Sequence, residues 1–416
     1  MSKYGIGLAS GLALAITATL PGPASRASTA RGAAVASASV AWVVNQSLRS
    51  AKTGSVTPID TATNTVIKNI PVSRNALTVA ITPDSKTAYV ALNAAGLGGR
   101  GLVIPVSTST YQVGAPIKIA SILPATMLIA PNGKTLYVGD WDGGTVTPIR
   151  TATNTVGRPI KTGPIPFTVT MAITPNSKTL YVVNEGPGTV TPINTATNTA
   201  GKNIKVGVTP AAIVITPDGK TAYVLNLARG APGKGTVVPV NTATNTAGNP
   251  IKVAGMFPDA LNLMVMTPNG KTIYAVAFTA MTPINTATNT ARPAIRVAPR
   301  HGQDFTAAIA PDGRTLYVAG GLGPQFTRGF VVPVSTATGA VGRAIVFRGQ
   351  PSVMALTPNG KALYVVCSGG ADSPQVVIPI NTTTNTAGPA INTGLEPTAI
   401  AITNGPRAAM TATRSP

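Results

Sequence analysis

Residues 209 to 253 read TPAAIVITPDGKTAYVLNLARGAPGKGTVVPVNTATNTAGNPIKV, and this stretch decides the fold. A compact apolar run at 211–216 ends in the turn Pro-Asp-Gly-Lys at 217–220, where glycine supplies a positive φ. The next run alternates in polarity around Tyr223. Two such runs joined by a tight turn predict a β-hairpin.

The rest of the stretch adds two more strands. A loop of variable length leads to a third apolar run at 236–240, a turn Asn-Thr-Ala-Thr-Asn at 241–245 and a short fourth run at 250–253. Four short strands within about 45 residues are typical of one blade of a β-propeller.

The turn phrase Thr-Ala-Thr-Asn-Thr returns along the chain, which identifies the blade as a repeat. Eight copies, clear or degraded, lie 43 to 50 residues apart, at 61–65, 107–110, 151–155, 195–199, 242–246, 286–290, 335–339 and 382–386. The inner-strand and third-strand patterns also occur eight times. This period predicts an all-β chain that folds as a single propeller of eight four-stranded antiparallel blades.

The two ends of the repeat region complement each other. The first copy begins at 41–45 without an inner strand, and the last copy ends at 396–403 with an inner strand that nothing follows. We therefore expect the C-terminal strand to pair into the first blade and close the ring. Each third strand also carries a proline, and we expect each proline to face a gap in the outermost strand.

The chain outside the repeat divides into two short segments. Residues 1–38 are interpreted as a secretory signal peptide and a disordered N-terminal segment, because Lys3 precedes an apolar run at 5–20. A membrane anchor is the competing interpretation of that run. We expect the propeller to span 39–405 and a disordered tail to span 406–416. The mature protein is then expected to be a secreted or cell-wall-associated monomer without a transmembrane span.

Composition limits the classes of partner. The chain has 32 lysines and arginines against 11 acids, a formal charge of +21, yet only 10 % of its residues are charged. It is therefore poor in acids more than rich in bases. Secretion and an aromatic content of 4 % argue against nucleic acid as a partner. Cys367 is the single cysteine, so it cannot form an internal disulfide, and we expect it to be a small buried residue.

Two segments, Tyr-Val-Val-Asn at 181–184 and Tyr-Val-Leu-Asn at 223–226, carry a resemblance to a known family. Each follows a Pro-(Asp/Asn)-(Gly/Ser)-Lys turn and precedes Thr-Val-(Thr/Val)-Pro, and in this the chain resembles the YVTN-type β-propeller repeat family. The resemblance covers nearly all of the mature chain. It implies a bacterial or archaeal surface or secreted propeller, commonly of seven blades, whose ligands are mostly unassigned. Seven blades is therefore the alternative to eight.

The connections of a propeller gather on two faces. First-to-second and third-to-fourth turns share one face, which is uniform in this chain, whereas second-to-third loops and blade links share the other, which varies. Binding residues usually lie on variable loops held by a rigid scaffold. We therefore expect ligand-binding residues on the varied face, namely Arg100, Asp140, Trp141, Asp142, Glu185, Arg229 and Arg328.

The segment around Trp141 has two interpretations. Trp141 offers a stacking surface for a glycan, or it packs against the neighbouring blade. Asp140 and Asp142 could hold Ca²⁺, although they lack the ligand spacing of a calcium loop, and an ordinary polar turn is the favoured interpretation. Apart from this calcium alternative, we expect no cofactor and no metal.

A second cluster is expected at the mouth of the central channel. Asp259, Asp304 and Glu396 each precede or begin an inner strand, with His301 nearby in sequence. In a catalytic site, His301 and one carboxylate would serve as acid and base; alternatively the carboxylates would hold a cation. The favoured interpretation is that these acids satisfy local backbone donors and that His301 is a solvent-exposed loop residue.

The uniform face carries a base in seven of its first-to-second turns. These bases are Lys86, Lys134, Lys178, Lys220, Lys271, Arg314 and Lys361. An anionic cell-surface polymer could bind such a circle. The circle of bases is also explained by solvated turn residues that were repeated by duplication, and we favour that interpretation.

No strong enzymatic motif is present. A single histidine excludes a multi-histidine metal centre, and the chain has no nucleophile elbow or phosphate loop. We predict a non-catalytic binding or scaffold protein for a glycan, a cell-wall polymer or a protein partner. The alternative is a small-molecule lyase or lactone hydrolase that uses His301 with Asp259, Asp304 or Glu396, and a purely structural surface-coat element is a third reading.

Overall fold

A computed structural model shows how each repeat folds. It describes residues 39–47, 53–73, 75–93, 100–121, 123–141, 143–163, 168–227, 234–254, 263–277, 280–297, 303–322, 327–368 and 374–403. Within these ranges there is no helix long and apolar enough to cross a membrane. The predicted signal segment and C-terminal tail lie outside them, so both stay predictions.

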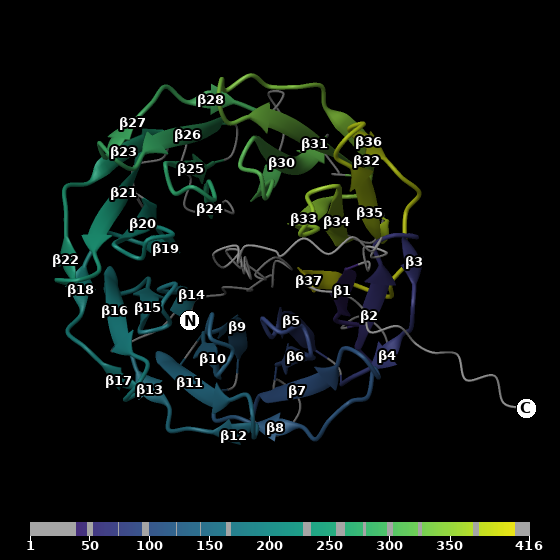
Figure 1. The fold of residues 1–416 in the computed structure, drawn as a ribbon, viewed down its shortest axis with the longest axis horizontal. Helices are drawn as coiled ribbons and strands as arrows, with labels where there is room; N and C mark the ends of the chain where they lie inside the picture. Colours follow the sequence, from purple (N-terminus) through teal and green to yellow (C-terminus); the bar gives the residue numbers. More distant parts are fainter. Residues whose placement is uncertain are drawn as a thin grey trace, which may run out of the picture.

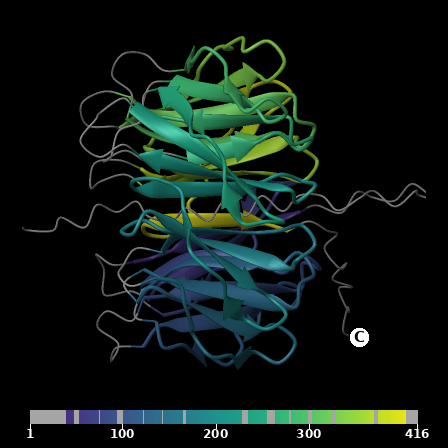
Figure 2. The same ribbon diagram turned by 90° about the vertical axis from the view of Figure 1, so that its left-hand side faces the viewer.

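The strands form eight antiparallel sheets arranged as blades around a central axis (Figure 1). The prediction of eight blades is confirmed. Each strand runs between the two faces of the ring, so the turns gather on the faces (Figure 2).

In blades 1 to 8 the inner strands are β37 (Pro397–Ile402), β5 (Ala76–Ile81), β9 (Pro124–Ile129), β14 (Thr168–Ile173), β19 (Pro210–Ile215), β24 (Leu263–Met266), β29 (Gln303–Ile309) and β33 (Pro351–Leu356). The second strands are β1 (Val40–Asn45), β6 (Thr87–Leu92), β10 (Thr135–Asp140), β15 (Thr179–Asn184), β20 (Thr221–Leu227), β25 (Thr272–Val276), β30 (Thr315–Leu322) and β34 (Ala362–Ser368).

The third strands are β2 (Ser55–Asp60), β7 (Leu102–Ser107), β11 (Thr145–Arg150), β16 (Thr189–Asn194), β21 (Lys234–Asn241), β26 (Ala280–Asn285), β31 (Arg328–Ser335) and β35 (Gln375–Asn381). The outermost strands are short pieces: β3 (Thr65–Val66) and β4 (Ile70–Pro71), β8 (Ile117–Lys118), β12 (Thr155–Val156) and β13 (Ile160–Lys161), β17 (Thr199–Ala200) and β18 (Ile204–Lys205), β22 (Thr246–Ala247) and β23 (Ile251–Ala254), β27 (Thr290–Ala291) and β28 (Ile295–Arg296), β32 (Ile345–Arg348), and β36 (Thr386–Ala387).

The outermost strand is interrupted opposite the proline of each third strand. In blade 1, β3 and β4 pair with opposite ends of β2, and Pro58 lies beside the gap between them. The Pro58 carbonyl accepts a hydrogen bond from Ile67 N, within that gap, at 2.9 Å. Because a strand residue directs its N–H and C=O to the same side, the missing N–H also faces the gap, and the ladder to the second strand loses nothing. All eight prolines accept the equivalent bond, which confirms the expected placement.

The C-terminal strand closes the ring. β37 pairs antiparallel with β1 and so supplies the inner strand of blade 1, as the sequence predicts. A buried side-chain pair adds to this closure, because Asn45 Nδ2 donates to Thr393 O at 2.9 Å and Thr393 Oγ1 donates to Asn45 Oδ1 at 3.0 Å. β1 is thereby paired on both of its edges, with β2 and with β37.

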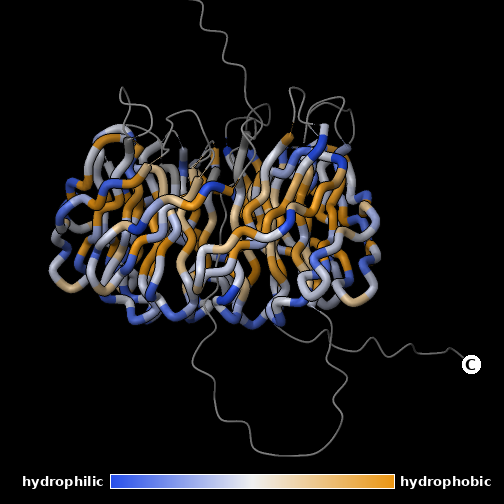
Figure 3. The backbone as a smooth tube through the Cα atoms, turned by 90° about the horizontal axis from the view of Figure 1, so that it is seen from above, coloured by the Kyte–Doolittle hydropathy of each residue, from blue (hydrophilic) through white to orange (hydrophobic). Residues whose placement is uncertain are grey.

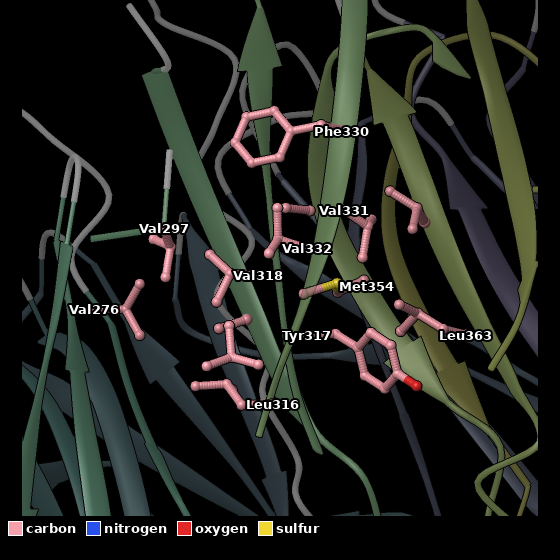
Figure 4. Close-up of a cluster of buried hydrophobic side chains, with 14 of the residues drawn as sticks. Val276, Val297, Leu316, Tyr317, Val318, Phe330, Val331, Val332, Met354 and Leu363 are labelled. Carbon is pink, nitrogen blue, oxygen red and sulfur yellow. The ribbon is translucent and has the colours of Figure 1, made fainter. Parts of the chain in front are cut away.

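The hydrophobic core lies between successive blades. Figure 4 shows part of one cluster, in which β25 contributes Val276, β30 contributes Tyr317 and Val318, and β31 contributes Phe330, while Met354 of β33 packs against them. Successive side chains of a strand point to opposite faces of its sheet, so each blade can pack against both neighbours. Aliphatic residues fill most of these layers, in agreement with the low aromatic content.

A tyrosine of the second strand fastens one blade to the next at most junctions of the ring. Tyr181 of blade 4 donates its hydroxyl to Asn245 Oδ1 of blade 5 at 2.7 Å, with Thr242 O as a second acceptor at 3.2 Å. We call this contact the tyrosine latch. Equivalent latches join Tyr89 to Asn154, Tyr137 to Asn198, Tyr223 to Asn289 and Tyr364 to Asn64.

The latch explains the repeated turn phrase residue by residue. In blade 4, Thr195 Oγ1 donates to Ser177 O in the first turn of its own blade, and the hydroxyls of Thr197 and Thr199 bond each other at 2.7 Å. Asn198 has a φ of 54°, a left-handed conformation that asparagine tolerates, and its side chain accepts the latch from the preceding blade. The phrase is therefore both a turn and an inter-blade contact.

The junction between blades 1 and 2 uses a different contact. Trp42 stands at the latch position of blade 1, and Tyr111, with a φ of 60°, stands at the asparagine position of blade 2. Their ring centroids are 5.9 Å apart. Trp42 is fully buried, and its Nε1 has no hydrogen-bond partner within the described part of the chain. Aromatic packing replaces the hydrogen bond at this junction.

Candidate functional site: the turn face and its groove

The turn face is the end of the ring that carries the first-to-second turns and the Thr-rich turns. Hydrophilic turns form this edge, while the apolar strands cross the middle of the ring (Figure 3). Asp84 Oδ1 accepts from Thr82 Oγ1 at 2.6 Å and from Lys86 N at 3.1 Å, which closes the turn. The hydrogen bond from Thr82 is the main cause that lowers the pKa of Asp84 below its usual value. The turn acids are thus engaged by their own turns.

Bases project from these turns into solvent. The seven predicted bases are all exposed, and we call them the basic circle. Within the described residues one ion pair is found, between Lys86 Nζ and Asp84 Oδ2 at 4.0 Å, with side chains 82 % and 57 % exposed. An exposed pair of this kind contributes about 0–1 kcal/mol. Asp84, Asp218 and Asp312 stand two residues before three of the seven bases, so the circle keeps a net positive charge.

A groove of about 980 Å³ crosses the turn face from blade 2 to blade 4. The first turns of blades 2 and 3 and the Thr-rich turns of blades 3 and 4 form its walls. Its charged lining residues are Asp84, Lys86, Lys134 and Arg150. The groove is consequently basic.

Arg150 marks blade 3 as different from the other blades. In blades 1 to 8 the third strand ends with Asp60, Ser107, Arg150, Asn194, Asn241, Asn285, Ser335 and Asn381. In blade 4 the Asn194 Oδ1 accepts from Ala196 N at 2.9 Å and Thr197 N at 3.3 Å, which caps the turn. An arginine has no acceptor and cannot form this cap.

The turn of blade 3 is left uncapped as a result. Within the described residues Ala152 N donates to no acceptor, and Thr153 N reaches only Arg150 O, at 3.4 Å. Ala152 and the Arg150 side chain are both exposed and both line the groove. One uncapped amide, Ala152 N, and a guanidinium therefore belong to neighbouring residues of the groove wall.

The last position of the second strand holds an asparagine in three blades. Asn184 Nδ2 donates to Thr191 Oγ1 at 2.8 Å and to Thr162 O, on the link from the preceding blade, at 3.3 Å. Asn45 and Asn226 make equivalent bonds to Thr393 O and Val206 O. These amides tie the blades together near the varied face.

Asp140 and Cys367 occupy the same position in blades 3 and 8. Asp140 is 7 % exposed, and its Oδ1 has no hydrogen-bond partner within the described residues. Cys367 is fully buried, as expected, and burial raises the pKa of its thiol to about 12. Asp140 is therefore better explained as a departure from a structural asparagine than as an exposed ligand.

Four of the other predicted residues of the varied face lie within the described ranges. Arg100 and Arg328 are exposed, whereas Trp141 and Glu185 are partly buried. Asp142 and Arg229 lie outside the described residues. Within the described ranges no three His, Cys, Asp or Glu side chains could hold a metal ion together. Because Asp142 lies outside them, the calcium alternative stays a prediction.

Of the residues in the predicted channel-mouth cluster, Glu396 is the one whose side chain the structure describes. Glu396 is partly buried with a φ of 53°, its N donates to Gln375 Oε1 at 2.8 Å and its carbonyl accepts from Gln46 N at 3.0 Å. His301, Asp259 and the side chain of Asp304 lie outside the described part of the chain. Catalysis by these residues stays a prediction.

Reasoning from the sequence missed Arg150 and the groove. The signal was present, because an alignment of the eight third strands shows a base at this end position in blade 3 and Asp, Asn or Ser in the others. The alignment could not show that the uncapped turn amide and two lysines line the same groove as Arg150.

The chain is similar to known proteins in fold alone. No family model and no curated protein matches it. Among solved structures, the dihydro-heme d1 dehydrogenase NirN in complex with DHE is 14 % identical, with a TM-score of 0.69, over 90 % of this chain and 78 % of that one. Hydrazine synthase of Kuenenia stuttgartiensis is 22 % identical, with a TM-score of 0.53, over 66 % and 87 % of the two chains.

A functionally unknown protein from Desulfotomaculum acetoxidans DSM 771 is 16 % identical, with a TM-score of 0.55, over 88 % and 99 % of the two chains. Likeness at these identities shows a shared propeller and nothing of chemistry. The YVTN-type repeat therefore stays a resemblance, and the chain is shown to be an eight-bladed β-propeller.

Proposed function

We propose that this propeller is a non-catalytic binding or scaffold protein outside the cell, and that it binds an anionic cell-wall polymer or glycan through its turn face. The observation that carries the proposal is the basic circle, in which seven exposed bases repeat around one face while the acids beside them are engaged in their own turns. The varied face, where the sequence analysis expects the ligand, contributes no described cluster that competes with it.

A ring of like charges suits a polymer better than a small molecule. Each lysine is exposed and separate, so a long anion can contact several of them at once, and modest individual contacts then add through multivalency. The field of such a surface also attracts anions from a distance. We expect an affinity that is high at low ionic strength and falls steeply as salt is added.

The test is binding of the full chain to polygalacturonate, with neutral dextran as the matched uncharged polymer. Wild-type protein should bind polygalacturonate and not dextran. The triple variant Lys220→Gln, Lys271→Gln, Lys361→Gln should bind roughly tenfold or more weakly, since each cation near an anionic surface contributes about 1 kcal/mol. Unchanged binding by the triple variant, or equal binding of dextran, would contradict the proposal.

A further inference from the structure

The groove on blades 2 to 4 differs from the rest of the turn face in both charge and hydrogen-bonding capacity. Resting on the proposed function, we infer that this groove is the specific subsite for the acidic polymer, and that it holds a carboxylate-bearing sugar unit against Arg150 and the uncapped Ala152 amide. The rest of the basic circle then attracts the polymer without selecting its units.

The capping of the neighbouring turns indicates which ligand group the subsite would bind. In blades 4, 5, 6 and 8 an asparagine Oδ1 accepts two turn amides, as Asn241 Oδ1 does from Ala243 N at 2.9 Å and Thr244 N at 3.1 Å. In blade 3 the first of these donors, Ala152 N, has no acceptor within the described residues and belongs to an exposed residue of the groove. A ligand oxygen placed where the asparagine oxygen lies in other blades would accept from this amide. A carboxylate suits the place, because its second oxygen can accept from Arg150.

The remaining charges in the groove favour the same ligand. Lys86 and Lys134 project from the first turns of blades 2 and 3, so three bases line the groove against one acid. That acid, Asp84, already accepts from Thr82 Oγ1 and Lys86 N. Both of these donors belong to its own turn. With three bases against this one acid, the groove has a net positive charge.

The uncharged lining favours a sugar over a nucleic acid. Asn132, Thr195 and Asn198 supply amide and hydroxyl groups that can bond sugar hydroxyls. Nucleic-acid grooves without sequence preference add exposed aromatic side chains on which bases stack. The aromatic residue of this lining, Tyr89, is 1 % exposed, and its hydroxyl is held by Asn154 Oδ1 at 2.8 Å. No stacking surface is present in the described lining.

The experiment measures binding of pentagalacturonate to the full-length protein, with its methyl ester as the uncharged ligand of the same sugar sequence. Arg150→Asn is the main variant, because asparagine is the residue of the equivalent position in blades 4, 5, 6 and 8 and should cap the turn without disturbing the fold. Arg292→Gln is the control, which removes one exposed positive charge that belongs neither to the groove nor to the basic circle.

We expect Arg150→Asn to weaken pentagalacturonate binding roughly ten- to hundredfold, since it removes charge-assisted hydrogen bonds and fills the amide site. Arg292→Gln should change it by about twofold or less. The methyl ester should not bind detectably. An unchanged melting temperature of Arg150→Asn keeps loss of binding separate from loss of folding.

Two outcomes would separate this inference from the proposed function. Equal weakening by both variants, with binding of polygalacturonate intact, would overturn the subsite and leave the function standing. Failure of wild-type protein to bind either polygalacturonate or pentagalacturonate would overturn both. Tighter binding of single-stranded poly(dT) than of polygalacturonate would overturn the choice of an acidic glycan.

Discussion

Tyr364, in the second strand of the last blade, donates its hydroxyl to Asn64 Oδ1 in the first blade, across 300 residues of sequence. Near the opposite face, Asn45 and Thr393 exchange hydrogen bonds across 348 residues. Between them β37 pairs with β1 along the strand. The ring is therefore closed by a backbone ladder and by side-chain contacts toward both faces, and one contact at the turn face is the same latch that joins other blades.

The latch predicts a measurable coupling between Tyr181 and Asn245. We expect Tyr181→Phe to lower the free energy of unfolding by about 1–2 kcal/mol, because a buried hydrogen bond is lost. Asn245→Gly removes the partner and keeps the φ of 54°, so it is the matched second variant. Chemical denaturation of both single variants and the double variant measures their coupling. Strictly additive losses would show that the hydroxyl does not act through Asn245.

Asp140 predicts a stabilising substitution. Its Oδ1 is buried without a partner, at a position where Asn184 donates to Thr162 O and Thr191 Oγ1. We expect Asp140→Asn to raise the free energy of unfolding by about 1–2 kcal/mol, since the amide can donate to the link from blade 2. The converse variant Asn184→Asp should lower it by about 1–3 kcal/mol. Thermal denaturation of the pair tests the comparison, and destabilisation by Asp140→Asn would mean that the carboxylate has a partner of its own.

Ring closure predicts a sharp boundary for C-terminal truncation. Removal of residues 404–416 leaves β37 in place, and we expect an unchanged melting temperature. Removal of residues 397–416 deletes β37 and exposes β1 along an open edge, together with the buried contacts of Ala399, Ile400 and Ala401. We expect that variant to be cleaved rapidly by protease or to aggregate. Equal protease resistance of the two truncations would show that blade 1 does not depend on β37.

The latch tyrosines predict loss of stability at alkaline pH. Burial raises the pKa of Tyr181 and of Tyr223 to about 12 and raises the pKa of Tyr364 as well. In the unfolded chain these hydroxyls ionise near pH 10. Their contribution is therefore fully present below about pH 10 and is lost as the pH rises toward 12, because the unfolded state then binds fewer protons than the folded state.

Melting temperatures between pH 8 and 12, combined with the ultraviolet absorbance of tyrosinate, measure this dependence. Tyr223→Phe should show a shallower decline above pH 10 than wild type. A melting temperature that stays constant while tyrosinate forms would show that the hydroxyls ionise within an intact ring, contrary to the expectation.

The fold could be predicted from the sequence because each blade is a local pattern that repeats. Runs such as 211–216 and 221–226, joined by Pro-Asp-Gly-Lys, specify a hairpin whatever surrounds them, and β19 and β20 agree with them within one residue. The fourth strand was predicted less well. The predicted strand at 250–253 is β23, but a further piece, β22, precedes it, and Pro239 lies beside the gap between them.

The site could be predicted only in part. The basic circle follows from the repeat, since equivalent turns of a closed ring must lie on one face. Arg150 was visible in the sequence as an irregularity of the repeat. Its possible role depends on the turn amide that an asparagine would otherwise cap, and on the residues that line the opposite wall of the groove. Asp140 shows the same limit, because its acidity suggested a ligand while its position is that of a structural amide.

The sequence by itself determined the blade, the number of blades and the pairing of the two chain ends, because strand alternation, turn residues and repeat length act over short distances. Only the tertiary structure decided which contacts join one blade to the next, which side chains form hydrogen bonds with the turn phrase, and where a groove lies on the uniform face. Those properties arise between residues such as Tyr181 and Asn245, or Lys86 and Arg150, which are brought together only when the ring closes.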